Sequence, residues 1–401
     1  MQTYDIIVVG AGISGLSLAH YCAKEGLKTL VIEKSDRVGG TLHSHRFENT
    51  GGFWLELGAH TCYNSYRSLI GIMEDCRIMD RLLSREKVPF KMLVDSRVKS
   101  IPSRLNFFEL LLSGPRLFTL KQEGRSVESY YSGIVGRTNY ERVIGPAMNA
   151  VISQRANDFP ANMLFKKRLR RKDVMKKYTL TGGVQTITDA IASQKAFEIV
   201  KGKEVSGIKS VGRRFQTTTG DEIYESNSLA LATPASAAAR LLNEPFPALA
   251  EKLAQIKVES VESVGVALRK ELVSLPPAAG LIPESDSFFS VVTRDTVRDD
   301  TYRGFTFHFK PGLLSYSAKL KRISEVLGVK QEQLGNVVAK ENFIASLRVG
   351  HEALVRSIDQ AIAGHQLFLT GNYFDGLAIE DCVARSHKEF SRLKGFIGRP
   401  H

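Results

Sequence analysis

The first forty residues alternate between apolar runs and glycine-rich turns. Residues 5–9 are mostly β-branched and apolar, a pattern typical of a strand that is covered on both faces of a parallel sheet. A helix is predicted at residues 14–25, where Gly26 ends it, and a second strand at residues 28–32. The order of strand, helix and strand predicts a βαβ unit at the N-terminus.

The periodicity changes several times further along the chain. Amphipathic helical runs fill residues 70–180, and residues 202–231 then alternate polar and apolar positions between glycine turns, which predicts a small antiparallel sheet. Residues 237–343 mix strand patterns with amphipathic helices. Near the C-terminus, residues 367–370 predict a buried strand, and a further helix is expected to start near Ile379.

Three glycines and one acid indicate the chemistry of the N-terminal unit. The glycines follow the first strand, where they permit a tight turn, close approach of a pyrophosphate and close packing of the helix on the strand. The anion would lie on the helix N-terminus, and the acid, about 20 residues beyond, would accept a hydrogen bond from a ribose hydroxyl. The predicted nucleotide contacts are Gly10, Gly12, Ile13, Ser14, Gly15 and Glu33.

A second glycine pair favours FAD over a nicotinamide cofactor. A nicotinamide dehydrogenase needs no special residue after the acid, whereas Gly39 and Gly40 expose backbone that further phosphate or ribityl oxygens can approach. With Arg37 they form an Arg-x-Gly-Gly motif, and here the chain resembles the FAD-containing amine oxidase superfamily, which includes monoamine oxidases, carotenoid desaturases and protoporphyrinogen oxidases. The resemblance implies that FAD is the cofactor. It adds as contacts Lys34, Arg37, Gly39, Gly40 and Thr41.

The same resemblance extends to three later segments. In the family, a Gly-Ala-x segment passes beside the flavin, a strand contacts adenine through its backbone, and a Thr-Pro strand end lies near the cofactor. The matching residues are Gly58, Ala59 and His60, then Val205 in a strand expected at residues 204–208, then Thr233 and Pro234. Structural roles stay open for His60, as a capping or surface histidine, and for Pro234, as an ordinary helix start.

The C-terminal segment has the same order of strand, glycine turn and helix as the N-terminus. In a flavoprotein, a helix N-terminus placed here would stabilise the negative charge of the reduced flavin. The predicted cofactor contacts are Gly371, Asn372, Gly376, Leu377 and Ala378.

Two elements at the C-terminal end narrow the resemblance to FAD-type protoporphyrinogen oxidases. These enzymes commonly carry Val-Gly-His about thirty residues before Gly-x-x-x-x-Asp-Cys-Ile/Val. The chain has Val349, Gly350 and His351, followed by a matching element that starts at Gly376 and ends with Asp381, Cys382 and Val383. The Pro-Gln-Tyr that usually precedes Val-Gly-His is absent, and the sequence offers no recognisable arginine for a porphyrin carboxylate.

We therefore expect an α/β fold, in which a Rossmann-like FAD-binding domain of the glutathione-reductase type is interleaved with an α+β substrate domain. The expected FAD-binding segments are 1–69, 180–236 and 346–401, and the expected substrate-domain segments are a helical part at 70–179 and a sheet with helices at 237–345.

The net charge of +13 bears on which partners the protein can bind. Much of it lies in the run LFKKRLRRKDVMKK at residues 164–177, which fits a membrane surface better than nucleic acid, because no aromatic residues are interleaved with it. A solvated helix face is the alternative. We expect a cytoplasmic protein that can bind peripherally to a membrane surface, with no nucleic-acid partner. The four cysteines show no metal-ligand spacing, so no metal is expected.

The predicted reaction is hydride transfer to FAD from a C–H bond of a small, apolar, conjugated substrate, for which protoporphyrinogen IX is the best candidate. Amine oxidation, carotenoid-type desaturation and a non-catalytic, FAD-binding partner protein stay as alternatives. The sequence identifies no catalytic residue.

Overall fold

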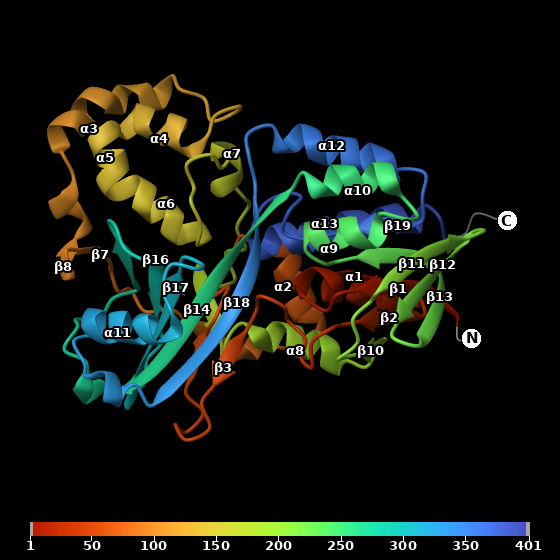
Figure 1. Cartoon of the computed structure of the whole chain (residues 1–401), viewed down its shortest axis with the longest axis horizontal. Helices are drawn as coiled ribbons and strands as arrows, with labels where there is room; N and C mark the ends of the chain where they lie inside the picture. Colours follow the sequence, from red (N-terminus) through yellow and green to blue (C-terminus); the bar gives the residue numbers. More distant parts are fainter. Residues whose placement is uncertain (1–2, 398–401) are drawn as a thin grey trace.

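The computed structural model describes residues 3–397 as two units that lie side by side (Figure 1). The chain passes repeatedly between them, and residues 1–2 and 398–401 of the expected first and last segments lie outside the described residues. The α/β fold class is confirmed, with a Rossmann-like unit at one end and a second sheet with helices at the other.

The first unit is built on a sheet whose central strands are parallel. Strand β13 pairs with β1, and β1 pairs with β2, so the predicted N-terminal strands lie at the middle of the sheet. Strands β11 and β12 extend it in antiparallel fashion. In spatial order the strands are β10 (Glu198–Val200), β2 (Thr29–Ile32), β1 (Thr3–Val9), β13 (Glu222–Leu231), β12 (Arg214–Thr219) and β11 (Gly207–Val211), with β19 (Leu367–Leu369) beside the end of β13.

Helices cover both faces of this sheet, as the uninterrupted apolar strand β1 requires. Ile6 and Val8 pack on one face, and Ile7 and Val9 on the other. The first face is covered by α1 (Ile13–Lys24), α2 (Arg67–Asp75), α8 (Gln185–Ser193) and α13 (Ile379–Lys394), and the second by α9 (Ala235–Leu242), α10 (Pro247–Ala254) and α12 (His351–Ile362).

The second unit holds a mixed sheet in which the long antiparallel strands β14 and β18 extend to the first unit at one end (Figure 1). One face packs on α11 (Tyr316–Leu327) through a cluster of phenylalanine and aliphatic side chains. The strand order is β18 (Asn336–Ser346), β14 (Lys257–Arg269), β17 (Tyr302–Phe309), β16 (Phe288–Thr293), β15 (Gly280–Pro283), β7 (Phe90–Val94) and β8 (Arg97–Ser100).

A helical group lies at the end of the second unit, above its sheet in Figure 1. It comprises α3 (Phe107–Ser113), η3 (Gly114–Phe118), α4 (Val127–Val135), α5 (Arg137–Asn139), η4 (Tyr140–Ile144), α6 (Gly145–Ile152) and α7 (Ala161–Leu164). The remaining short strands and turns are β3 (Ser44–Arg46), β4 (Trp54–Glu56), β5 (Cys62–Tyr63), β6 (Leu82–Ser84), β9 (Lys177–Leu180), η1 (Met79–Arg81), η2 (Ile101–Arg104), η5 (Lys270–Leu272) and η6 (Gln331–Gln333).

Four expectations about local structure are wrong. Helix α2 packs in the core of the first unit with α13, so the expected boundary after residue 69 cuts through it. The expected strand at residues 204–208 begins only at Gly207. The segment 70–179, expected to be helical, also contains strands β6, β7 and β8. The basic run at residues 164–177 is mostly irregular between α7 and β9, so the helix face offered as its alternative does not form.

Charge pairing explains why the basic run is not a uniform cationic face. Arg168 reaches Asp381 at 2.6 Å, and Arg171 reaches Glu74 at 2.7 Å. These bonds tie the run to α13 and α2, and they remove part of the charge that the sequence offers to an external partner.

Candidate functional site

The first glycine turn leaves no room for side chains at two positions. Gly10 has a φ of +102°, and a Cβ there would lie 2.8 Å from the Ala232 carbonyl oxygen. A Cβ on Gly15 would lie 1.9 Å from the Gly10 carbonyl oxygen. The turn that follows β1 is therefore packed tightly against both α1 and the end of β13.

Gly12 differs, because a Cβ added there would meet no atom within 4 Å. It is the N-cap of α1, no side chain caps that helix, and its first turn, which begins at Ile13 and Ser14, contains no acid. Free backbone N–H groups of α1 therefore face open space, which is the arrangement that binds a phosphate.

Glu33 lies at the end of β2 and is buried. Its carboxylate accepts hydrogen bonds from the backbone N–H groups of Ala11 at 2.7 Å and Ser35 at 2.9 Å. Lys34 beside it is exposed. The backbone N–H of Lys203 bonds to the Glu33 carbonyl at 3.0 Å, which brings the buried Val205 close to this acid although it lies in a loop.

The second glycine pair lies directly against the first glycine turn. Gly39 forms a bridge with Gly12, and a Cβ on Gly40 would lie 3.3 Å from the Gly12 Cα. Arg37 braces this loop, because its guanidinium donates to the carbonyls of Val38 at 2.9 Å and Gly40 at 2.5 Å. The two glycine motifs thus form one surface.

The loop continues through Thr41 to the predicted flavin-side segment. Ala59 donates to the Thr41 carbonyl at 3.3 Å, and a Cβ on Gly58 would lie 2.2 Å from that oxygen. His60 is half-buried, and its Nδ1 lies 3.3 Å from the Gly58 carbonyl oxygen. Burial, together with the neighbouring Arg85, lowers the pKa of His60 to about 4, so the imidazole is neutral at pH 7.

The remaining predicted residues follow β13 and β19, at the same sheet edge as Gly10 and Glu33. Thr233 follows β13, where its hydroxyl is buried without a partner among the described residues, and Pro234 is the N-cap of α9. After β19 come Gly371, Asn372, Gly376, Leu377 and Ala378, which lead into α13. The carboxyl ends of parallel strands thus gather these segments, the usual position of a ligand in such a sheet.

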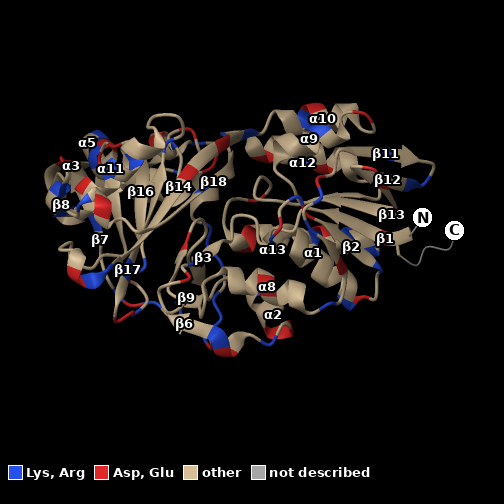
Figure 2. Ribbon diagram, turned by 60° about the horizontal axis from the view of Figure 1, so that its bottom comes forward, with Lys and Arg blue, Asp and Glu red and all other residues tan. Residues whose placement is uncertain are grey.

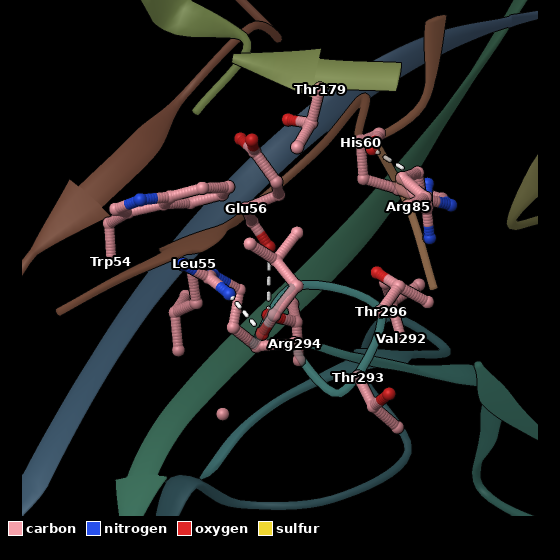
Figure 3. A pocket seen from close by; sticks show the side chains of 13 residues that line it. Trp54, Leu55, Glu56, His60, Arg85, Thr179, Val292, Thr293, Arg294 and Thr296 are labelled. Atoms are coloured by element: carbon pink, nitrogen blue, oxygen red, sulfur yellow. Dashed lines mark hydrogen bonds between the residues drawn. The ribbon is translucent and has the colours of Figure 1, made fainter. Parts of the chain in front are cut away.

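A cavity opens where the segment that contains β4 and His60 meets the second sheet (Figure 3). Trp54 and Glu56 come from β4, Arg85 and Thr179 from the connecting segments, and Arg294 from the loop after β16. The complete lining is Trp54, Leu55, Glu56, His60, Arg85, Thr179, Val292, Thr293, Arg294, Thr296, Val297, Gly304 and Thr306. Only His60 belongs to the residues predicted from the sequence.

The cavity contains one buried acid, Glu56, and two arginines whose charges act on that acid without forming an ion pair in the described part of the chain. Burial raises the pKa of Glu56 to about 7, although Ser44 and the Val184 N–H donate to its carboxylate. Burial lowers the pKa of Arg294 to about 10 and also lowers that of Arg85. Within residues 3–397, neither guanidinium forms an ion pair.

Arg294 is held in place without using all of its donors. Its guanidinium carbon lies 4.0 Å from the ring centre of Trp54, and it donates to the Val297 carbonyl at 2.6 Å. Its Nε and the Thr179 hydroxyl are buried and have no partner among the described residues. The lining therefore offers positive charge and free hydrogen-bond donors, which suits a carboxylate.

One signal in the sequence pointed to this cavity. Glu56 interrupts an apolar run just before Gly58, and an acid in that position is unusual for a buried strand. Arg85 and Arg294 lie in segments without a motif, so only the fold brings them to His60.

Comparison with known proteins identifies the family. The family model described as "Flavin containing amine oxidoreductase" matches residues 13–336, which is most of the chain. The chain belongs to this family. As a flavin-containing amine oxidoreductase it is an FAD-dependent oxidoreductase, and the glycine surface beside the free N-terminus of α1 fits that cofactor.

Individual relatives differ in how much of this amine oxidoreductase they match. Protoporphyrinogen oxidase 1 of Arabidopsis thaliana is 22% identical and covers 99% of this chain and 89% of its own length. The 15-cis-phytoene desaturase of Narcissus pseudonarcissus is 28% identical over 34% of this chain and 25% of its own.

Among solved structures, a candidate protoporphyrinogen oxidase from Exiguobacterium sp. 255-15 aligns with a TM-score of 0.79 at 17% identity. The alignment covers 97% of this chain and 98% of that one, which shows a shared fold.

Proposed function

We propose that this FAD-dependent oxidoreductase removes hydride from a C–H bond of a conjugated substrate that carries carboxylates, with protoporphyrinogen IX as the best candidate. The proposal rests mainly on one observation, the match to a protoporphyrinogen oxidase along 99% of the chain. The Val-Gly-His and Asp-Cys-Val elements near the C-terminus agree with it.

We further propose that FAD lies along the edge of the first sheet. The diphosphate would bind the N-terminus of α1 at Gly12 and the loop at Gly40, and the ribose would bind Glu33. The flavin would then lie beside Gly58 and the N-terminus of α13, with Val205 near the adenine. When bound, FAD supplies the hydride acceptor, and oxygen or another acceptor reoxidises it.

The residues around the cavity would position the substrate and exclude water. Arg85 and Arg294 supply positive charge for a substrate carboxylate, and the indole of Trp54 offers an apolar wall. A protonated amine would meet two guanidinium charges there against one carboxyl, Glu56, whose raised pKa of about 7 leaves it only partly ionised at neutral pH. The cavity therefore favours an acidic substrate over amines, and over a polyene, which would leave both arginines without a partner.

The substrate proposal is tested by steady-state oxidation of protoporphyrinogen IX, followed as porphyrin fluorescence. We expect Arg294→Gln to raise KM by roughly tenfold to a hundredfold, since a hydrogen bond to a charged group contributes about 1.5–3 kcal/mol. Arg298→Gln is the matched control, because Arg298 lies in the same loop with its side chain 81% exposed. Equal KM values for the two variants would remove Arg294 from substrate binding, and FAD binding with no oxidation of any donor would favour the non-catalytic alternative.

We also propose that the helical group contacts an anionic membrane surface. Phe107, Phe108, Leu111, Leu112 and Phe118 are each between 62% and 89% exposed. The cations near this surface in sequence are Arg97, Lys99, Arg104, Arg116, Lys121 and Arg125. Figure 2 shows basic residues around α3, α5 and β8 at this end of the molecule.

The acid of α3 does not oppose such a contact. Glu109 turns inward, where it accepts hydrogen bonds from the backbone N–H groups of Thr138 at 2.9 Å and Asn139 at 3.0 Å. An apolar surface bordered by cations fits anionic headgroups better than a neutral partner. No helix among residues 3–397 is long and apolar enough to cross a membrane, so the contact would be peripheral.

Vesicle sedimentation tests this contact. We expect the protein to pellet with vesicles that contain phosphatidylglycerol, and to pellet less with pure phosphatidylcholine or at high salt. The double variant Phe108→Ser and Phe118→Ser should lose most of the binding, while Leu313→Ser, at another exposed apolar position, should not. Binding that is the same for all three proteins would contradict the proposal.

A further inference from the structure

One face of the second sheet carries a row of polar side chains across four neighbouring strands. Ser290 of β16 is the Cα partner of His308 in β17, His308 is the partner of Ser263 in β14, and Ser263 is the partner of Lys340 in β18. The first three side chains are buried and Lys340 is half-buried. The alternation along each strand places this row opposite the phenylalanine face that packs on α11.

The row faces the first unit. Asn342, two residues after Lys340 and on the same face of β18, donates to the Leu57 carbonyl at 2.8 Å and to the Ser263 hydroxyl at 3.0 Å. The Ser263 hydroxyl lies 2.9 Å from His308 Nδ1. The sheet therefore contacts the segment that leads into Gly58 through polar groups here, beside an apolar cluster in which Leu55 and Leu57 pack on Ala267 of β14.

Lys340 extends from the same face to the second glycine loop. Its ammonium donates to the Gly40 carbonyl oxygen at 2.7 Å, the oxygen to which Arg37 also donates, at 2.5 Å. Two cations from different units thus share one carbonyl. In the described part of the chain, neither forms an ion pair with a carboxylate.

The charges around Gly40 favour an anion. Gly40 lies against Gly12, where the N-terminus of α1 adds further positive potential, and Gly12 has open space beside it. Two like charges and a helix N-terminus around one half-open position repel one another unless a negative group lies between them.

We infer that Lys340 is a cofactor-contacting residue, whose ammonium binds the diphosphate of FAD from the second unit. The inference rests on the proposed position of FAD at Gly12 and Gly40. It implies that bound FAD links the two units. Lys340 belongs to β18 of the second unit, whereas the other proposed diphosphate contacts, Gly12 and Gly40, belong to the first.

The titration of Lys340 gives this contact a pH signature. Burial and the charge of Arg37 lower the pKa of Lys340 to about 7 in the cofactor-free protein. The neighbouring His43 is held neutral at this pH, since burial and both cations lower its pKa to about 3. Near Arg37 lie the carboxylates of Glu33, Asp36 and Asp189. A diphosphate favours the ammonium form and raises the pKa of Lys340, so binding takes up a proton above pH 7.

FAD titration of the apoprotein, read by quenching of flavin fluorescence from pH 6 to pH 9, tests the inference. We expect the affinity of the native chain to fall as the pH rises above about 7, with calorimetry in two buffers showing proton uptake. Lys340→Met should weaken binding at pH 6 by about tenfold to thirtyfold, the effect of one lost charge-assisted bond, and should lose the pH dependence. Lys340→Arg should restore most of the affinity without it.

Two controls make the outcome decisive. ADP carries the diphosphate without the flavin, so Lys340→Met should lose affinity for ADP in parallel with FAD. Lys257 is an exposed lysine at the start of β14, and Lys257→Met should bind both ligands like the native chain. Unchanged affinity and pH dependence in Lys340→Met would overturn the inference, as would a loss for FAD but not for ADP. A native chain that binds neither ligand would instead overturn the proposed position of FAD.

Discussion

Gly12→Val is expected to abolish FAD binding while the protein stays folded. An added Cβ meets no protein atom within 4 Å, so the cofactor-free backbone accepts a side chain here without a clash at its first carbon. The same side chain fills the approach to the α1 N-terminus. Loss of one or two hydrogen bonds to a charged phosphate, at about 1.5–3 kcal/mol each, weakens binding roughly 100-fold or more. The purified variant should be colourless, and FAD titration measures the loss.

Gly15→Ala is the contrasting variant three residues away. Its Cβ would lie 1.9 Å from the Gly10 carbonyl oxygen, so α1 and the turn cannot keep their positions. We expect a lower thermal midpoint for this variant even without FAD, whereas Gly12→Val should lose only about 1 kcal/mol from the weaker helix cap. A yellow Gly12→Val protein with native FAD content would contradict the proposed diphosphate position.

Arg385→Met is expected to cost about 3–5 kcal/mol of unfolding free energy. The side chain of Arg385 is fully buried in α13, and it reaches Asp359 of α12 at 2.8 Å and Glu389 at 2.9 Å. Its guanidinium also lies 3.8 Å from the ring centre of Phe374 and donates to the Leu369 carbonyl at 3.0 Å. Methionine removes one of the ion-pair partners of the buried Glu389. It also removes the hydrogen bond to Leu369, which holds the strand end before the loop that begins at Gly371.

Urea unfolding of the apoprotein measures this loss, with Arg240→Met as the control. Arg240 and its partner Glu204 are both about two-thirds exposed, so that pair is screened by water and contributes little. The midpoint should fall clearly for Arg385→Met and stay near the native value for Arg240→Met. Similar midpoints would mean that the Arg385 network does not hold α12, α13 and β19 together.

The sequence predicted those parts of the fold that local chemistry determines. The apolar run after Asp5 forms β1, and the predicted acid lies at the end of β2. The turn glycines are needed where backbones approach closely, as at Gly10 and Gly15. Such features depend on neighbours in sequence, so a pattern can report them.

The features that the sequence did not predict depend on register and long-range contact. The strand expected at residues 204–208 starts later, because Gly202 and Lys203 bond to Ser35 and Glu33 after the end of β2, and pairing with β12 begins only at Ser206. The basic run is held by pairs such as that of Arg168 with Asp381, more than two hundred residues away, which no local pattern reports. The row from Ser290 to Lys340 exists only through the pairing of four strands. Arg85 and Arg294 line the same cavity only in the folded chain.

Anaerobic mixing of the FAD-loaded protein with protoporphyrinogen IX tests the central claim most directly. Flavin absorbance and porphyrin fluorescence are followed together, against a protein-free control and against an amine and a polyene. We predict that protoporphyrinogen IX bleaches the flavin absorbance without air, and that the amine and the polyene leave the flavin oxidised. Because each FAD takes up one electron pair and the porphyrin forms only after several pairs are lost, porphyrin fluorescence should follow when air is admitted, faster than in the protein-free control. A flavin that stays oxidised with protoporphyrinogen IX, or that the amine or the polyene reduces instead, would contradict the proposed function.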